Sequence, residues 1–462
     1  MWLNYIIDIN YPKIIKNMNK KISIIGLGFV GLPMLVNLAS KKLKKKYNFE
    51  VLGIERNDEV AKKKITQIRN GILPIKSNDK ELNAQFKNIH RNNRIKISTN
   101  IEDIKESDII VISIGFDFSK KNSIKNVNKL FSSIGSNLKK GSLILIETTM
   151  PPGTCEKIIY PTINKQLLRR KIKSNDIYFG YSFERIMPGV NYINSINNNF
   201  RAYSGINNKS KKKIKVFLES FINFKKFPLQ EFNKIEECEL CKIIENSYRS
   251  INIAFIDEWM KFSKKRNLNL NKILEVIRIR PTHKNIMKTG IGVGGYCLTK
   301  DSNFANLSNK LFDKQKINFP ISDLGNKINS RMINNSIDFI FSNIKNLKTK
   351  SFLVLGSTYK EDVGDFRHSP SVALINNLKK KIKNIKTYDP FLDDNKDIIK
   401  IKTLKKFDVL IFCVSHDQFK KFNFSKIIKF KNYCFDLNHV IPKKNLDKID
   451  KKKNKIFILG DY

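Results

Sequence analysis

The sequence is poor in cysteine and has no long apolar run. Six cysteines among 462 residues are too few and too scattered for a disulfide framework, which fits a reducing, cytoplasmic compartment. Cys238 and Cys241 have the spacing of a metal-binding pair, but no second pair or histidine follows at ligand spacing, so we expect no metal. No apolar stretch reaches the roughly 18–20 residues that cross a bilayer, so we expect no membrane insertion. Residues 1–20, which we expect to form an N-terminal tail, lack the features of a signal peptide.

Acidic residues are scarce relative to basic ones. The chain has 87 Lys and Arg against 42 Asp and Glu, which gives a net charge of +45. Clustered basic residues would indicate nucleic-acid binding, because they neutralise phosphates. Here the lysines are spread along the whole chain and no known nucleic-acid motif is present, so we expect solvated surfaces and no nucleic-acid partner. A positive field would also attract small anionic molecules.

The order of apolar runs predicts an α/β protein of more than one domain. A chain of 462 residues is too long for one ordinary core, so we expect two or three domains. In the first part, β-branched runs alternate with helical or polar stretches, which is typical of a doubly wound parallel sheet. The predicted strands lie at residues 21–25, 51–54, 108–114 and 142–147, and a helical pattern follows Gly31 to about Lys46.

The middle and last parts of the chain differ in periodicity. From about residue 211 to 270 a 3.6-residue period replaces the strand pattern, and the absence of Gly and Pro from Cys238 to Phe262 predicts one long helix. Alternation returns near Ser351, with predicted strands at 352–356, 385–389, 409–414 and 433–437. We therefore predict an N-terminal Rossmann domain, a central all-helical domain and a C-terminal Rossmann-like α/β domain, at residues 21–212, 213–335 and 336–462.

A glycine motif between the first strand and its helix predicts a dinucleotide site. Gly26 would permit the tight turn, Gly28 would let a pyrophosphate approach the backbone, and Gly31 would let helix and strand pack closely. Glu55 ends the next strand, where a carboxylate accepts hydrogen bonds from a ribose diol and repels a 2′-phosphate. This favours NAD over NADP, although Arg56 next to it could pair with that phosphate. The predicted cofactor-binding residues of this turn are Gly26, Gly28, Phe29, Val30, Gly31 and Glu55.

A second glycine-rich segment precedes a candidate nucleophile. Four glycines stand within six residues, at positions 290, 292, 294 and 295, and such a loop leaves backbone amides open to a ligand. Cys297 follows directly, so we expect it to be accessible, unlike a cysteine packed in a core. Lys300 and Asp301 come next, and a nearby cation favours the thiolate, which is the nucleophilic form.

Three further places could line a site, although each also has an ordinary structural explanation: a solvated helix face for Lys242 and Asn246, a plain Pro-Gly turn for Thr149 and an exposed ion pair for Glu184. Lys242 and Asn246 are four residues apart and would share one helix face. Thr149 belongs to a Pro-Gly turn at a strand's carboxyl end, where open α/β sheets bind ligands. Glu184 precedes Arg185, with which it could equally form an exposed ion pair.

A basic loop follows the predicted strand at 352–356. It contains Tyr359, Lys360 and Arg367, whose cations suit phosphate or carboxylate. The alternative for this stretch, taken by itself, is a solvated charged loop.

Together these stretches resemble the nucleotide-sugar 6-dehydrogenase family, whose best-known member is UDP-glucose 6-dehydrogenase. The resemblance covers about residues 20–462, with the motifs in the same order and at matching intervals. It implies an NAD-binding domain, a central helical domain that forms a dimer, and a C-terminal UDP-sugar-binding domain. It also implies oxidation of the C6 hydroxymethyl of a UDP-sugar to a carboxylate, with two NAD reduced, through a cysteine thiohemiacetal and thioester. We therefore expect NAD, a UDP-sugar and a homodimer or higher homo-oligomer.

The resemblance also implies roles for single residues. Cys297 matches the family's nucleophile, and Asp301 matches the aspartate that helps to position water and lysine. Lys242 and Asn246 match the pair that stabilises developing oxyanions. Glu184 matches the general base of thioester hydrolysis.

The remaining matches concern the turn and the basic loop. Thr149 matches a threonine near the nicotinamide and the catalytic water. Lys360 resembles the lysine that binds the UDP-sugar, and Arg367 an arginine that contacts the cofactor. The candidate substrate-binding residues are Lys360, Tyr359, Gly294 and Gly295.

Departures from the family pattern bear on the choice of sugar. Phe183 stands where many members have proline, and residues 115–117 (Gly-Phe-Asp) replace a Thr-Pro turn. The segments around Glu184 and Asn246 resemble the branch that acts on UDP-N-acetylglucosamine or UDP-N-acetylmannosamine, so we expect a UDP-N-acetylhexosamine 6-dehydrogenase of surface polysaccharide synthesis. The alternatives are a UDP-glucose 6-dehydrogenase and a single-step NAD-dependent hydroxy-acid dehydrogenase.

Overall fold

The computed structural model describes residues 20–43, 46–118, 120, 122–313, 317–393, 399–428, 432–446 and 455–462. They form two compact units. The first holds the described residues up to 75 together with 79–242, and the second holds 76–78 and 243–462. Apart from Lys20, the predicted N-terminal tail lies outside the described residues. Within the described ranges, none of the helices combines the length and the apolar character that a bilayer span requires.

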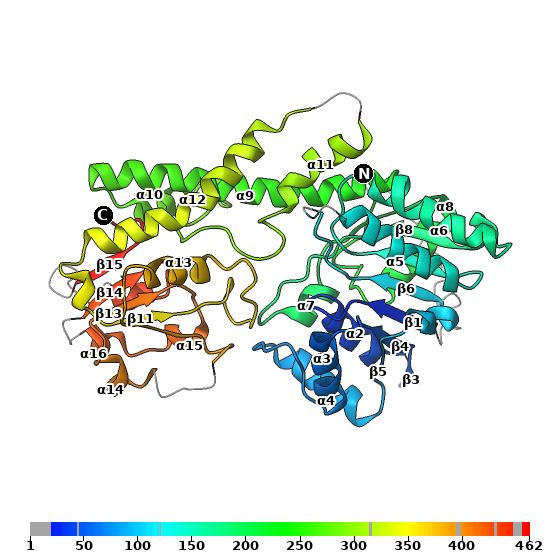
Figure 1. Cartoon of the computed structure of the whole chain (residues 1–462), viewed down its shortest axis with the longest axis horizontal. Helices are drawn as coiled ribbons and strands as arrows, with labels where there is room; N and C mark the ends of the chain where they lie inside the picture. Colours follow the sequence, from blue (N-terminus) through cyan, green and yellow to red (C-terminus); the bar gives the residue numbers. More distant parts are fainter. Residues whose placement is uncertain are drawn as a thin grey trace, which may run out of the picture. The chain divides into compact units, whose positions relative to one another are not determined.

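The first unit is built on one eight-stranded sheet (Figure 1). Its strands are β1 (Lys20–Ile25), β4 (Phe49–Ile54), β5 (Lys96–Ser98), β6 (Ile109–Ile112), β7 (Leu143–Ile146), β8 (Tyr178–Tyr181), β9 (Ala202–Gly205) and β10 (Gln230–Glu231). The spatial order is β10-β9-β8-β7-β6-β1-β4-β5, and neighbours are parallel except β8 and β9. All residues of β6 and β7 are buried, as expected of strands that helices cover on both faces.

Helices connect these strands. They are α2 (Gly31–Ser40), α3 (Glu59–Arg69), α4 (Lys80–Arg91), α5 (Ser123–Asn137), α6 (Tyr160–Arg169), α7 (Tyr192–Asn197) and α8 (Asn208–Glu219), with short turns η2 (Ile101–Glu106), η3 (Cys155–Ile159) and η4 (Ser174–Asp176). Side chains of Asp58, Asp79 and Asn207 cap α3, α4 and α8 by accepting backbone N–H groups. These caps satisfy donors that a helix start leaves free.

The helix after the glycine turn is shorter than the sequence predicts. It ends at Ser40 instead of near Lys46. A small antiparallel pair follows, formed by β2 (Lys42–Leu43) and β3 (Lys46–Tyr47). The Lys42 ammonium and the Arg94 guanidinium each lie 4.6 Å from the centre of the Tyr47 ring, so cation–π contacts favour this hairpin over a further helical turn.

One long helix, α9 (Ile235–Arg266), begins in the first unit and ends in the second. It confirms the long helix predicted over residues 238–262. Acidic residues stand in its first turn and basic residues in its last, which suits the helix macrodipole.

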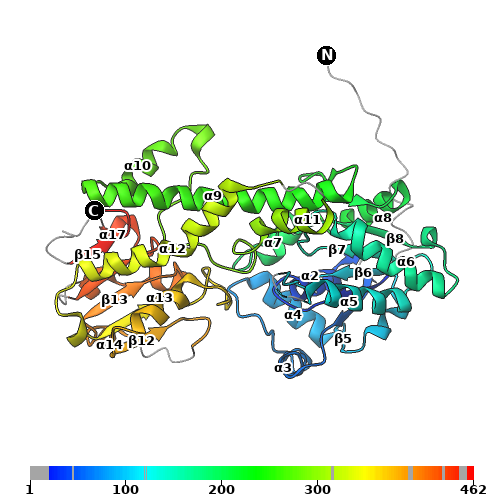
Figure 2. The ribbon, with the colours of Figure 1, turned by 45° about the horizontal axis from the view of Figure 1, so that its top comes forward.

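The second unit combines further helices with a parallel sheet. The helices are α10 (Leu270–Ile277), α11 (Phe304–Phe312), α12 (Pro320–Ser342), α13 (Pro370–Lys379), α14 (Ile401–Leu404), α15 (Asp417–Lys420), α16 (Phe424–Ile428) and α17 (Lys443–Leu446), with turns η5 (Pro281–His283), η6 (Asp301–Asn303) and η7 (Leu347–Thr349). The strands are β11 (Phe352–Leu355), β12 (Ile385–Tyr388), β13 (Val409–Phe412), β14 (Tyr433–Asp436) and β15 (Ile456–Ile458), in the order β12-β11-β13-β14-β15. Figure 2 shows α12 beside α13, on which it packs.

The predicted fold class, two Rossmann-type α/β parts with a helical part between them, is confirmed. The domain limits themselves stay a prediction. Sequence analysis missed β2, β3, β5, β8, β9, β10 and β15. In β8 the apolar run is broken by Gly180, where a Cβ atom would come within 2.3 Å of the Ser204 carbonyl oxygen on the neighbouring strand. The close approach of the two backbones therefore requires glycine at position 180, and this glycine interrupts the apolar run that would have predicted the strand.

Candidate active site

The three glycines of the turn after β1 serve two purposes, close packing and space for a ligand. Gly26 has φ +95°, and a Cβ atom on it would lie 2.9 Å from the Ser113 carbonyl oxygen. A Cβ atom on Gly31 would lie 1.9 Å from the Gly26 carbonyl oxygen. A Cβ atom on Gly28 would meet no described atom within 4 Å. Gly26 and Gly31 are therefore needed for packing, whereas Gly28 leaves open the space that a pyrophosphate needs.

Helix α2 starts at this turn without a polar cap. Its N-cap is Val30, whose side chain has no oxygen to accept an N–H from the first turn, and no acidic residue stands in that turn. Phe29 packs partly against the core of the first unit. A helix start of this kind suits a bound anion, because its N–H groups and its dipole both favour negative charge.

Glu55 lies at the end of β4 and reaches back to the glycine turn. Its carboxylate accepts the N–H of Leu27 at 3.1 Å and pairs with the Lys64 ammonium at 2.6 Å. Burial would raise the pKa of Glu55, but the hydrogen bonds, led by that of Lys64, lower it. Arg56 points elsewhere: its guanidinium pairs with Asp58 at 3.4 Å and its side chain is 77% exposed. An ionised Glu55 beside the open Gly28 fits a ribose diol, and the residues present therefore fit a dinucleotide.

Lys242 and Glu184 lie together in the first unit. Lys242 is buried on α9, and its ammonium donates to the backbone carbonyl oxygen of Glu184 at 3.1 Å. It also lies 5.4 Å from the centre of the buried Phe183 ring. The Glu184 carboxylate accepts the backbone N–H of Ile186, which fixes the carboxylate against its own loop. Phe183, the departure from the family pattern, thus provides an aromatic face for the lysine.

The arginine after Glu184 has its own partners. Arg185 donates to the Phe200 carbonyl oxygen at 3.0 Å and stacks over the Phe183 ring at 5.3 Å. These contacts hold the loop after β8 in place.

Glu239 ties the turn that carries Thr149 to helix α9. Its carboxylate is completely buried and accepts the N–H of Gly153 at 2.7 Å and that of Cys155 at 3.0 Å. Burial raises the pKa of Glu239 to about 8, although hydrogen bonds from Cys155 and Gly153 favour the charged form. Thr149 is half-buried in the turn after β7. Sequence analysis missed Glu239, but it lies four residues from both Ile235 and Ile243, so it belongs to a buried helix face.

In the second unit, Asp301 joins Asn246 to Lys300. The Asn246 side-chain amide donates to Asp301 at 2.7 Å, and the Lys300 ammonium pairs with the other carboxylate oxygen at 2.6 Å. Asp301 is completely buried, and its backbone N–H donates to the Cys297 carbonyl oxygen at 2.9 Å. The turn therefore fixes Cys297 and Asp301 relative to each other.

Cys297 differs from most other cysteines in its exposure. It is exposed, whereas burial raises the pKa of four other thiols, those of Cys155, Cys238, Cys413 and Cys434. Buried thiols of raised pKa are inert, so accessibility favours Cys297 as a nucleophile.

The glycine loop before Cys297 packs on the basic loop after β11. A Cβ atom on Gly295 would lie 2.6 Å from the Tyr359 ring, and one on Gly294 would lie 2.5 Å from Pro370. Close packing therefore requires glycine at these two positions. We had expected the glycines only to leave backbone amides open to a ligand. Arg367 lies in the same loop and makes two bonds to Asp365, at 2.9 and 2.7 Å.

Those bonds to Asp365 raise the pKa of Arg367, and Cys297 adds to the shift. A thiolate at Cys297 would therefore lie within electrostatic reach of a guanidinium. Lys360 is half-buried nearby along the chain; burial lowers the pKa of Lys360, Glu361 opposes that shift and Arg249 adds to it.

The chain has two doubly wound sheets, one of which carries a dinucleotide turn and an acid for the ribose. It also has an exposed cysteine on the turn that holds the buried Asp301 and its partner Lys300. These are the features of a dinucleotide-dependent oxidoreductase. Three models of one family match the chain: the NAD binding domain at residues 20–221, the central domain at 236–331 and the UDP binding domain at 353–443. The chain belongs to the UDP-glucose/GDP-mannose dehydrogenase family, and it is an NAD-dependent nucleotide-sugar dehydrogenase.

Several proteins of known kind are similar over nearly the whole chain. A UDP-N-acetyl-D-mannosamine dehydrogenase of Methanococcus aeolicus is 30% identical over 411 residues, which is 87% of this chain and 86% of that protein. A UDP-N-acetyl-D-glucosamine 6-dehydrogenase of Salmonella typhi is 27% identical over 446 residues, 92% of this chain and 98% of that protein. The solved UDP-D-ManNAc dehydrogenase of Pyrococcus horikoshii has 25% identity and a TM-score of 0.77, covering 96% of this chain and 99% of its own.

Proposed function

We propose that the chain oxidises the C6 hydroxymethyl of a UDP-N-acetylhexosamine, N-acetylglucosamine or N-acetylmannosamine, to a carboxylate for surface polysaccharide synthesis. The observation that carries the proposal is the exposed Cys297, fixed by its turn to the buried Asp301, to which Asn246 and Lys300 both bind. Relatives named for both N-acetylhexosamines support this choice over UDP-glucose, which remains the second candidate.

The reaction needs two oxidations on one enzyme. NAD, when bound, accepts a hydride in each of them. After the first oxidation, the Cys297 thiolate adds to the aldehyde carbon, and the aldehyde oxygen takes up a proton. The resulting thiohemiacetal keeps the aldehyde on the enzyme. The second oxidation turns this adduct into a thioester, and water then cleaves the thioester to release the carboxylate and the free thiol.

The chain's charged and polar residues suit these steps. The Lys242 ammonium and the Asn246 amide would stabilise the oxyanions that develop on the substrate. Glu184 would take a proton from the hydrolytic water, and Thr149 would help to hold that water. Asp301 would position the water and the lysine. Within the first unit the contact of Lys242 with the Glu184 carbonyl supports these roles, and within the second unit that of Asn246 with Asp301 does so.

Other residues would bind the substrate and the cofactor. Lys360, with Tyr359, Gly294 and Gly295, would bind the UDP-sugar, and Arg367 would contact the cofactor. NAD would be held by the glycine turn and the acid after β4, that is by Gly26, Gly28, Phe29, Val30, Gly31 and Glu55. The exposed Arg56 side chain pairs with Asp58, which supports a preference for NAD over NADP.

We also propose the three domains at 21–212, 213–335 and 336–462, a homodimer or higher homo-oligomer through the central helices, and a cytoplasmic location. Support for self-association comes from α9, where Phe255, Trp259 and Phe262 are each nearly half exposed and contact one another edge to face. An exposed aromatic stripe of this kind marks an interaction surface.

The test is the amount of NADH formed per sugar in a panel of UDP-sugars. Two NADH per UDP-N-acetylhexosamine consumed would support the proposal, whereas one would indicate a single-step hydroxy-acid type of dehydrogenase. Preferred turnover of UDP-glucose would overturn the choice of sugar. The Cys297→Ser variant serves as the control, and we expect it to retain UDP-sugar binding while acid formation is nearly abolished.

A further inference from the structure

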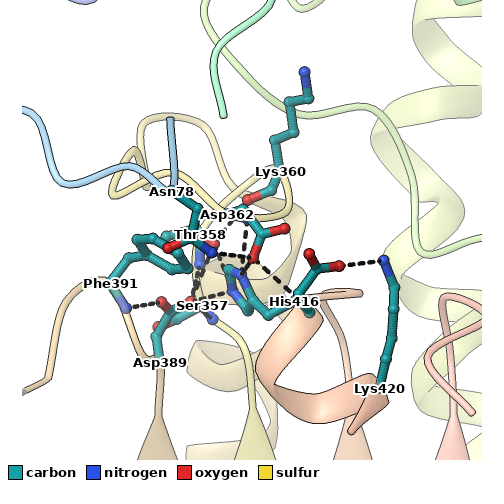
Figure 3. Close-up of polar contacts among 10 residues, drawn as sticks. Asn78, Ser357, Thr358, Lys360, Asp362, Asp389, Phe391, His416 and Lys420 are labelled. Carbon is teal, nitrogen blue, oxygen red and sulfur yellow. Dashed lines mark hydrogen bonds and ion pairs between the residues drawn. The ribbon is translucent and has the colours of Figure 1, made fainter. Parts of the chain in front are cut away.

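A buried polar cluster lies at the carboxyl ends of three strands of the second unit (Figure 3). Thr358 follows β11, Asp389 follows β12 and His416 follows β13. All three side chains are completely buried. None belongs to the residues assigned above to cofactor, substrate or catalysis.

The direction of one hydrogen bond assigns the roles of the two ring nitrogens of His416. The backbone N–H of Asp362 donates to Nδ1 of His416 at 2.9 Å. A backbone N–H can only donate, so Nδ1 carries no proton and Nε2 does. Nε2 faces a carboxylate oxygen of Asp389 at 3.1 Å and the Thr358 hydroxyl at 3.2 Å, both of which can accept. His416 thus links Asp362 to Asp389. Burial would lower the pKa of His416, but the carboxylates of Asp362 and Asp389 raise it.

Asp389 occupies the position in the second sheet that corresponds to Glu55 in the first, but its carboxylate binds the protein's own backbone. Each acid follows the strand next to a glycine turn, and Gly356 has φ +97° as Gly26 has φ +95°. One Asp389 oxygen accepts the N–H groups of Ser357 at 2.8 Å and Thr358 at 2.9 Å.

The other Asp389 oxygen accepts the N–H of Phe391 at 2.9 Å. Burial would raise the pKa of Asp389, but hydrogen bonds, led by that of His416, lower it to about 2. Its oxygens are engaged by the protein, so it holds the loop and leaves no acceptor for a ribose.

Both sides of Lys360 are therefore fixed from this cluster. The Thr358 hydroxyl bonds to the Lys360 carbonyl oxygen at 3.0 Å. On the other side, Asp362 adopts a left-handed backbone with φ +56°, which a non-glycine residue keeps only when its surroundings hold it. His416 supplies such a hold through the Asp362 N–H. In Figure 3 the Lys360 side chain points away from the cluster.

We propose that His416 is a positioning residue for UDP-sugar binding: its unprotonated Nδ1 holds the Asp362 backbone, and this sets the loop that presents Lys360. The proposal rests on the proposed function, in which Lys360 contacts the UDP-sugar. It adds a residue that acts through the loop and touches neither substrate nor cofactor.

Two substitutions separate the two halves of the histidine ring. In His416→Asn the side-chain oxygen can take the place of Nδ1 and accept the Asp362 N–H, while the donor to Asp389 is lost. In His416→Gln the longer amide can donate to Asp389, while the Asp362 N–H is left without an acceptor. A buried donor without a partner is costly, so the loop should leave its place in the Gln variant.

We expect the KM for the UDP-sugar to rise about ten-fold in His416→Gln and less than three-fold in His416→Asn, with kcat and the KM for NAD nearly unchanged in both. Equal KM values in wild type and the Gln variant would overturn the proposal. So would equal impairment of both variants, or the reverse order, because the Asp362 tether would then not be the cause. Thermal unfolding of each variant shows whether stability follows the same order.

A second substitution tests whether the effect passes through Lys360. In a Lys360→Met background, His416→Gln should raise the KM for the UDP-sugar much less than in wild type, since coupled residues are not additive. Additive effects would contradict the proposed route. Calorimetric titration of the full chain with UDP separates this inference from the proposed function. A wild type that binds UDP but oxidises no UDP-sugar would refute the function. The order of the variants in UDP affinity would still decide the role of His416.

Discussion

Asn246 donates its side-chain amide to a carboxylate oxygen of Asp301, and the two atoms are 2.7 Å apart. The other oxygen of that carboxylate takes the Lys300 ammonium at 2.6 Å. A completely buried carboxylate thus has a neutral donor on one side and a cation on the other. Such an arrangement compensates for the loss of water around the charge and fixes the direction of all three side chains.

Replacing Asn246 with Asp would put two carboxylates face to face at this point. We expect kcat for UDP-sugar oxidation to fall at least ten-fold, because the donor is lost and like charges repel at hydrogen-bond distance. The unfolding free energy should fall by about 1–3 kcal/mol, as for other buried polar groups that lose a partner. Steady-state kinetics and urea denaturation measure the two effects. The exposed Glu245→Gln change on the same helix is the control, and an equal loss there would contradict the explanation.

Glu184→Gln is expected to stop the reaction after the second oxidation. The amide cannot take a proton from water, so the thioester on Cys297 should accumulate. Intact-mass measurement after mixing the variant with NAD and the UDP-sugar would detect the added acyl group. Absence of the adduct, together with a normal rate of acid formation, would exclude Glu184 as the hydrolytic base.

The glycine turn predicts opposite outcomes for two similar changes. Gly28→Ala adds a methyl group to open space, so the variant should fold with nearly wild-type stability but bind NAD at least ten-fold more weakly. Gly31→Ala forces a Cβ atom against the Gly26 carbonyl, so it should lower the unfolding free energy by several kcal/mol. Denaturation curves and NAD titration test the pair. Equal stability losses in the two variants would show that the turn is not packed as described.

Glu239 predicts a pH dependence of stability. Burial raises its pKa to about 8 in the folded chain, so the folded state holds this proton more tightly than the unfolded state does. The stability that the group contributes is present below its unfolded pKa and is lost as the pH rises through about 8. We expect Glu239→Gln to reduce the fall in unfolding free energy between pH 5 and pH 9.

Urea denaturation at pH 5, 7 and 9 gives that fall for each protein. The exposed Glu237→Gln variant, two residues away on α9, should keep the wild-type profile. Parallel profiles for wild type and Glu239→Gln would refute the assignment.

Sequence patterns predicted the elements in which local and tertiary preferences agree. The strands β6 and β7 are apolar runs because both of their faces are buried, and β1 and β4 are apolar over most of their buried positions. The glycine turn was predictable because Gly26 and Gly31 meet steric limits that no other residue satisfies. Likewise, α9 lacks any helix-breaking residue over most of its length.

The features that sequence analysis missed depend on contacts between distant segments. Gly180 weakens the pattern of β8 because Ser204, 24 residues further on, approaches its backbone. The left-handed Asp362 depends on His416, which is 54 residues away in the chain. No local pattern of residues encodes either contact. The end of α2 at Ser40 was missed for the same reason, because Arg94 from another segment contacts the Tyr47 ring.

The unequal burial of the cysteines has a practical consequence. Since Cys155, Cys238, Cys413 and Cys434 are shielded within the fold, a mild alkylating reagent applied to the native protein would modify chiefly Cys297, with the half-buried Cys241 as the one competitor among the described residues. The moles of reagent incorporated, compared before and after saturation with substrate, would count the competent molecules in a preparation. With Cys297 in the role of the proposed function, the reagent would serve as an active-site titrant, and specific activities from different preparations could be placed on one scale.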